Sequence, residues 1–471
     1  MTIWRSSCLA LAVAAAFPLP AAAQSNAELL KELRALRDRV TQLEDKLKTA
    51  EAAKPAPAPV AAVAAPTGWA AAPAPAGMTP DQARELGRLA VKVDALEDQR
   101  DSSPFKGLVI TGSIDPVFIY NRAQDRAGFQ LLDNVGNDNG GYAYDNSFFG
   151  NATLDFQKEF EGGTKMRLTL MPDRGTGASI GGSIIHEASA SIPLTDENTR
   201  LLVGQIPDWS GYELLPSVQN KLITHNLLFD LIAPFTYTGA GLEVTRGDWV
   251  VKGVVANMNS TKRASGDKTP VLAYRADYTI SEYSGIGFSG VHGKAYNPNG
   301  GSDTGLNLFE VDGFFVRGDW TLQGQASYGR QSKAAIVGDA DTSEFQDAQW
   351  WGLSALAAYK FDPRLEGVIR ADYINNRKNG GGLLGFGRDS VNGIGPGYFK
   401  DENGDWQESY NHHGTNRYAL SVGGNYRFNE YTLFKLEYRF DFADRRVFEY
   451  VDKGTYKKNN QLFGASVVVT F

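Results

Sequence analysis

A strict alternation of apolar and charged residues is the feature of this sequence that most restricts its fold. In YTLFKLEYRFDF, residues 431–442, the apolar side chains fall on one face and the charged side chains on the other. Residues 272–278, 365–373 and 417–428 alternate in the same way. A period of two residues indicates β-strands. One apolar face and one fully charged face are typical of strands that separate lipid from water.

Strands of a soluble sandwich also alternate, so the lengths of the connections decide between the two architectures. Short connections, such as 161–163 and 196–198, alternate with long ones, such as 121–146, 207–234 and 377–413. An even number of strands with short turns at one end and long loops at the other is typical of an outer-membrane barrel. We therefore predict an all-β transmembrane fold over 104–471, a 16-stranded antiparallel barrel with strands at 105–120, 147–160, 164–172, 184–194, 199–206, 235–246, 248–259, 270–280, 284–295, 305–317, 319–331, 347–361, 363–376, 414–428, 430–444 and 458–471.

The N-terminal part predicts export and self-association. Residues 1–23 combine one positive charge, a short apolar run and a small-residue cleavage site, which is typical of a signal peptide. Residues 24–51 and 79–101 carry leucines spaced by three and four residues, which predicts an α-helical coiled-coil stalk, with an Ala/Pro-rich linker at 52–78 between them. One amphipathic helix on a globular core is the alternative for 24–51. The heptads do not separate a dimer from a trimer.

The charged strand faces are expected to line the lumen, because lipid cannot solvate them. Sixteen strands enclose an interior too wide for side chains to fill, so we expect a water-filled channel. The net charge of -7 is mixed and offers no basic surface for nucleic acid. The residues expected to face the lumen are Arg275, Asp277, Glu366, Arg370, Asp372, Arg417, Arg427, Lys435, Glu437, Arg439 and Asp441.

The long loop at 207–234 contains many apolar residues, which are not expected in an extracellular loop surrounded by water. We expect it to fold inward onto the barrel wall and to narrow the pore. Its polar residues Glu213, Lys221, His225 and Asp230 are then candidates for the constriction. Packing at a subunit contact or as a lid is the alternative.

Metal and catalytic motifs are sparse. Asp401, Asn403 and Asp405 have the spacing of calcium ligands, but the glycine and the final glutamate of such a loop are misplaced, so an ordinary polar turn is the alternative. Asp401, His412 and His413 share one loop, where a barrel enzyme would place its catalytic groups. We read them as solvated loop residues and expect no enzyme activity, no cofactor and no metal.

Residues 203–244, VGQIPDWSGYELLPSVQNKLITHNLLFDLIAPFTYTGAGLEV, resemble the OmpL-like outer-membrane porins of the putative beta-barrel porin-2 family. The N-terminal part resembles the phosphate-selective porins, which carry a periplasmic coiled coil. The resemblance implies a general diffusion channel and a homotrimer in the outer membrane of a Gram-negative bacterium. Phosphate-selective porins depend on dense lumenal Arg and Lys, whereas acidic residues outnumber basic ones in this sequence, which argues against phosphate selectivity. The terminal Phe471 resembles the C-terminal signal that the barrel-assembly machinery recognises.

The sequence thus predicts a porin, embedded in outer-membrane lipid, that passes small hydrophilic solutes or ions passively, with its coiled coil in the periplasm. A structural envelope protein that tethers the outer membrane to the periplasm through residues 24–101 is the alternative. The sequence does not name the solute or the sign of ion selectivity.

Overall fold

A computed structural model describes residues 106–132, 149–172, 184–259, 269–297, 299–336, 345–378, 383–384, 393–409 and 414–471. The predicted signal peptide, coiled coil, linker and second helix, together with His412 and His413, lie outside these residues. No helix within the described ranges is long and apolar enough to cross a membrane.

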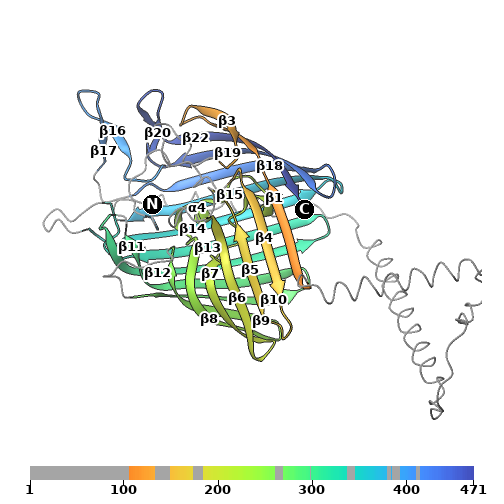
Figure 1. The fold of residues 1–471 in the computed structure, drawn as a ribbon. Coiled ribbons are helices and arrows are strands. Elements are labelled where there is room, and N and C mark those ends of the chain that lie inside the picture. The colour runs from red at the N-terminus through yellow and green to blue at the C-terminus, as the bar shows by residue number, and fades with distance from the viewer. Residues whose placement is uncertain are drawn as a thin grey trace, which may run out of the picture. The chain divides into compact units, whose positions relative to one another are not determined.

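Antiparallel strands dominate the described residues, with one 3₁₀ turn and one short helix (Figure 1). Their bounds are β1 Leu108–Ile114, β2 Val117–Asn121, β3 Arg126–Gln130, β4 Ala152–Glu159, β5 Lys165–Leu170, β6 Ile185–Asp196, β7 Thr199–Pro207, η2 Ser217–Gln219, α4 Leu227–Ile232, β8 Thr236–Arg246, β9 Trp249–Met258, β10 Val271–Ser281, β11 Ser284–Asn297, β12 Ser302–Arg317, β13 Trp320–Gln331, β14 Ala348–Lys360, β15 Leu365–Lys378, β16 Tyr398–Lys400, β17 Trp406–Glu408, β18 Arg417–Arg427, β19 Thr432–Ala443, β20 Phe448–Tyr450, β21 Thr455–Lys457 and β22 Asn459–Thr470.

The described strands close into a barrel of sixteen, which confirms the predicted fold class. β1 and β2 together form the first barrel strand, and both pair with β22, the last one. Phe471 completes the seam, because its backbone N–H and C=O both pair with Gly112, at 3.0 and 3.2 Å. The Phe471 ring lies over this glycine, where an added Cβ would come within 2.4 Å of it. A closed sheet leaves no unpaired edge, as a barrel in lipid requires.

Four details differ from the prediction. The first strand, expected as one segment at 105–120, is divided between β1 and β2 at Pro116, which has no N–H to donate to the ladder. The predicted loops contain further short strands: β3 pairs with β2, β16 with β17, and β20 with β21. Three-residue strands carry too short an alternation to be recognised in a sequence.

The two faces of the barrel wall differ as the alternation predicts. On β19, Leu436 and Tyr438 are 55% and 47% exposed, whereas Glu437 and Arg439, which alternate with them, are buried. Apolar side chains from all around the barrel share the outward face, which suits contact with lipid. The charged side chains therefore point to the inside.

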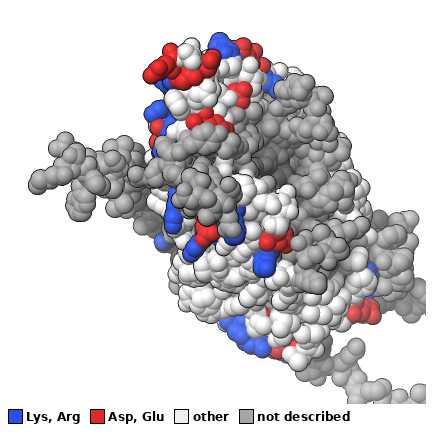
Figure 2. Space-filling model, turned by 90° about the vertical axis from the view of Figure 1, so that its left-hand side faces the viewer, with Lys and Arg blue, Asp and Glu red and all other residues white. Residues whose placement is uncertain are grey.

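The hairpins β16–β17 and β20–β21 project from the end of the barrel that carries the long loops (Figure 1). They contact each other through stacked rings of Tyr398 and Tyr456, whose centroids are 3.7 Å apart. Figure 2 views the molecule from this side, where acidic and basic side chains lie next to one another. Neither sign of charge dominates the described surface in that view.

Candidate functional site

The segment 207–234 crosses the inside of the barrel. It leaves β7, the fifth barrel strand, and returns to β8, the sixth. Its tip nevertheless contacts β15, β18 and β19, the thirteenth to fifteenth strands, on the opposite wall. We call this segment the crossing loop. Its inward folding agrees with the expectation drawn from its apolar residues.

Two buried arginines and one glutamate of the far wall hold the tip of the crossing loop. Arg370 on β15 donates to Glu213 Oε1 at 2.8 Å and to the carbonyls of Thr224 and His225 at 2.7 and 2.8 Å. Arg439 on β19 donates to the His225 carbonyl at 2.7 Å. Buried backbone groups need such partners, since water cannot reach them.

Glu437, between these arginines, accepts hydrogen bonds from the backbone N–H groups of Ile223 and Thr224, both at 2.8 Å. Its second oxygen accepts the Thr224 hydroxyl at 2.7 Å. The wall thus offers donors to the loop carbonyls and an acceptor to the loop N–H groups. We call Arg370, Glu437 and Arg439 the wall clamp.

Glycines on the wall make room for the apolar side of the crossing loop. A Cβ added at Gly423 would lie 2.4 Å from Leu222, and one added at Gly464 would lie 3.1 Å from Ile223. Next to these contacts, Asn226 caps helix α4 by accepting from the N–H groups of Leu228 and Phe229. The hydrogen bonds of the wall clamp and the apolar packing therefore hold the same segment, residues 222–226.

All four residues predicted for the constriction lie on or near the anchored side of the crossing loop. Glu213 is bonded to Arg370, and the side chain of Lys221 forms an ion pair of 2.6 Å with Glu366. The fully buried His225 stacks on Phe229 and contacts the Leu214 carbonyl, and Asp230 lies 4.0 Å from Arg439. Their role in the constriction stays a prediction.

The residues predicted to face the lumen engage one another or the crossing loop. Arg275 binds Asp312 at 2.7 Å, Asp277 at 2.8 Å and the Trp209 carbonyl at 2.7 Å. Lys435 donates to the carbonyls of Ser217 and Asn220, and Arg417 pairs with Asp441 at 3.3 Å. Asp372 accepts from Ser354 and Arg370, whereas Arg427 is exposed beside a small cavity that Glu366 also lines.

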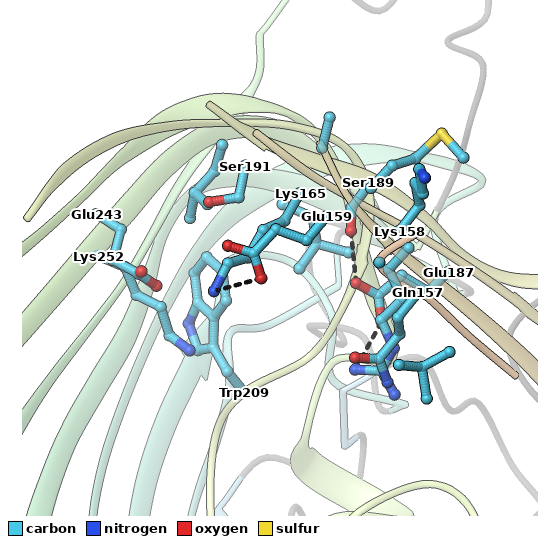
Figure 3. A pocket seen from close by; sticks show the side chains of 17 residues that line it. Gln157, Lys158, Glu159, Lys165, Glu187, Ser189, Ser191, Trp209, Glu243 and Lys252 are labelled. Carbon is cyan, nitrogen blue, oxygen red and sulfur yellow. Dashed lines mark hydrogen bonds and ion pairs between the residues drawn. The ribbon is translucent and has the colours of Figure 1, made fainter. Parts of the chain in front are cut away.

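Two adjoining cavities remain between the crossing loop and the wall of β4–β9. The larger, of about 540 Å³, is lined by His186 and Thr169 of the wall and by Leu215 and Phe229 of the loop, among others. The smaller, of about 360 Å³, is shown in Figure 3. The residues that line both cavities are Gln157, Arg167, Glu187, Ile206, Trp209 and Lys252.

The sequence patterns did not single out the charged residues of these cavities. Arg167 forms ion pairs with Asp155 at 3.0 Å and Glu187 at 3.4 Å, and Lys252 lies over the Trp209 ring at 4.8 Å. Strand β6 mixes Ala, Ser and a proline, so its alternation is weak. Only the antiparallel register brings these side chains to one place.

The suggested calcium ligands belong to the turn between β16 and β17. Asp401 Oδ1 accepts from the N–H groups of Asn403 and Asp405, at 3.0 and 2.9 Å, and its Oδ2 accepts from Gln407. These bonds occupy the carboxylate, as in an ordinary polar turn. No cluster of three or more metal-ligating side chains occurs among the residues that the structure describes.

Solved structures of similar architecture include the outer membrane channel DcaP of Acinetobacter baumannii, with 13% identity, a TM-score of 0.48, and 77% of this chain and 97% of that chain covered. The anion-selective porin from Comamonas acidovorans has 9% identity and a TM-score of 0.47, over 77% of this chain and 99% of that chain. OmpT of Vibrio cholerae has 8% identity and a TM-score of 0.47, over 77% and 97%.

No curated protein matches the chain. The resemblance to the OmpL-like porins is not confirmed by these comparisons. A family model does match almost the whole sequence, residues 5–471, and the chain belongs to that family, DUF3138, a protein family of unknown function.

Proposed function

We propose that this chain is an outer-membrane channel through which small hydrophilic solutes or ions diffuse passively. The observation that carries the proposal is the crossing loop, which fills the β14–β19 side of the lumen and leaves polar cavities along β4–β9. A barrel that served only as a membrane anchor would not need an open part of the lumen lined by acidic and basic side chains. Such a lining favours polar solutes over lipid-like ones.

In this proposal the crossing loop sets the width of the path, and the wall clamp holds the loop in place. Glu213, Lys221, His225 and Asp230 then act as anchors, because each lies against the wall or within the loop itself. The groups that a passing solute meets are those of the β4–β9 side, with Arg167, Glu187 and Lys252 among them. No catalytic group or cofactor is required.

The remaining parts of the proposal concern the surroundings of the barrel. We place it in the outer membrane of a Gram-negative bacterium, delivered by the barrel-assembly machinery, with residues 24–101 in the periplasm as the coiled coil of a homotrimer. These residues lie outside the described part of the chain. A tether to the periplasm would depend on them alone, and the barrel offers no observation in its favour.

Planar-bilayer recording of the purified full chain in a KCl gradient tests the proposal. We expect stepwise conductance, with steps in groups of three for a trimer, and a reversal potential that gives the ion preference. A variant without residues 24–101 separates the barrel from its stalk and should keep the conductance of each channel. A complete lack of conductance in a preparation with heat-modifiable gel mobility would contradict the channel.

A further inference from the structure

We propose that the cavity of about 360 Å³ beside Trp209 binds small zwitterions with an apolar side chain, the chemistry of neutral α-amino acids. The inference rests on the proposed channel, because it assigns that channel a preferred class of solute. It depends on three features of the cavity: two charged groups that make no hydrogen bond or ion pair with a described residue, the position of these groups on neighbouring strands, and an apolar strip beside them.

Most charged groups that line this cavity are already engaged. Arg167 pairs with Asp155 and Glu187, and Lys165 lies 3.9 Å from Glu159. The Lys158 ammonium bonds the Lys106 carbonyl. A charge with such partners gains little from a ligand, since binding would only exchange one partner for another.

Lys252 and Glu243 are different. Both line the cavity and are half-buried, and neither makes a hydrogen bond or an ion pair with any described residue. They lie directly opposite each other on the antiparallel pair β8–β9. Lys252 instead places its ammonium 4.8 Å from the centre of the Trp209 ring (Figure 3). This contact is a cation–π interaction and not an ion pair.

An apolar strip lies beside these two charges. Leu202 and Ile206 of β7 line the cavity together with Trp209, and all three pack against the main buried cluster of the barrel. An aliphatic side chain laid on this strip would remove apolar surface from water. A solute without an apolar part would leave the strip uncovered.

The three features together specify the ligand class. A carboxylate can bind Lys252 while an ammonium on the same small molecule binds Glu243, and each contact is charge-assisted. A simple anion would meet the repulsion of Glu243, and a simple cation that of Lys252. The zwitterion is the species that satisfies both groups, and its apolar side chain covers the strip.

Single-channel recording in KCl tests the proposal, with leucine added as the probe. Three further probes each lack one feature: isoamylamine has no carboxylate, 4-methylpentanoate has no ammonium, and glycine has no apolar side chain. We expect leucine to produce transient block of the current at concentrations at least about tenfold lower than any of the other three. Isoamylamine and 4-methylpentanoate each lose one charge-assisted contact, and glycine loses the burial of an apolar side chain. Equal block by leucine and by the singly charged probes would overturn the assignment.

Two variants locate the site. Lys252→Met and Glu243→Gln should each weaken block by leucine about tenfold or more while the KCl conductance stays measurable. Lys252→Met should keep the response to isoamylamine, and Glu243→Gln the response to 4-methylpentanoate. The matched control is Lys294→Met on β11, an exposed lysine outside both cavities. Block by leucine that is unchanged in both site variants would overturn the proposal.

A lack of KCl conductance in the parent protein would contradict the channel and not the cavity. Calorimetric titration of the detergent-solubilised full chain with leucine then decides the second question. Binding that is lost in Lys252→Met and Glu243→Gln and kept in Lys294→Met would support the site without the channel. No heat of binding with leucine in the parent protein would end the proposal.

Discussion

Arg370 on β15 donates a hydrogen bond of 2.8 Å to Glu213, which lies in a segment rooted on the opposite side of the barrel. Both side chains are buried, with 0% and 3% of their surface exposed. This ion pair, like that of Lys221 with Glu366, thus joins the crossing loop to the opposite wall of the barrel. Because its partners also include two loop carbonyls, Arg370 fixes both a side chain and the backbone of the loop.

Replacing this arginine should release the crossing loop. In Arg370→Met, Glu213 and Asp372 stay buried without the Arg370 cation, and the Thr224 carbonyl loses its donor, whereas the His225 carbonyl keeps Arg439. Breaking a buried pair in this way costs about 3–5 kcal/mol. We expect a larger and noisier single-channel conductance and a lower temperature for the loss of folded gel mobility.

Two further variants make that result interpretable. Arg370→Lys keeps the charge but not the planar fork, so its effect should be intermediate. Arg364→Met removes an arginine from an exposed turn and should leave both quantities unchanged. Parent-like conductance and thermal behaviour in Arg370→Met would show that the arginine does not hold the loop.

Gly423 offers a test of the apolar side of the contact. A methyl group there would come within 2.4 Å of Leu222 and 2.8 Å of the Leu436 carbonyl. Gly423→Ala should therefore displace the loop tip and lower the thermal stability by about 1–3 kcal/mol, as overpacking does. Loop displacement would appear as increased current noise.

The neighbouring glycine provides the control for this substitution. At Gly424 the nearest atom to an added Cβ is 3.8 Å away, which is ordinary contact. Gly424→Ala changes composition and β-propensity in the same way but should leave conductance and noise as they are in the parent. Equal effects of the two alanines would mean that the loop contact is not the cause.

The side chain of Asn226 should stabilise the fold by capping helix α4. Its side chain accepts from Leu228 and Phe229, so Asn226→Ala leaves two buried N–H groups without that acceptor. Loss of such a cap costs about 1 kcal/mol. Asn226→Asp keeps an acceptor and should behave like the parent in heat-modifiable mobility. A stable alanine variant and an unstable aspartate variant would refute the capping role.

The barrel could be predicted because the alternation of apolar and polar residues within each strand reflects which face is outside and which is inside. Lys435 and Leu436 differ in burial as their order in the sequence requires, and the same holds on β14, β15 and β18. The break at Pro116 and the small hairpins produce no recognisable alternation, since each involves only a few residues. Local sequence therefore predicts the wall much better than it predicts the ends.

For the candidate site, the sequence predicted the inward loop but not its destination. The apolar residues of 207–234 require burial, and any part of the wall could provide it. Arg370 and Arg439, which bind the loop, lie eight and ten strands after β7 around the barrel. Contacts so distant in sequence leave no local pattern. The position of the loop also decides which side of the lumen stays open, the side with Lys252 and Glu243. No local sequence pattern predicts this side.

Asp208, at the root of the crossing loop, should make stability depend on pH. It accepts hydrogen bonds from Tyr237 at 2.5 Å and from the backbone of Ser210 at 3.1 Å. Burial raises the pKa of this carboxyl above its usual value of 3.8 in spite of these bonds. The folded protein therefore favours the protonated carboxyl.

The direction of the effect follows from linkage. The stabilising contribution of protonated Asp208 is fully present below pH 3.8 and is lost as the pH rises through the higher pKa of the folded state. Asp208→Asn stays neutral throughout. Its thermal midpoint relative to the parent should thus be higher at pH 7 than at pH 4. The same difference in thermal midpoint at both pH values for Asp208→Asn would show that burial of its charge is unimportant.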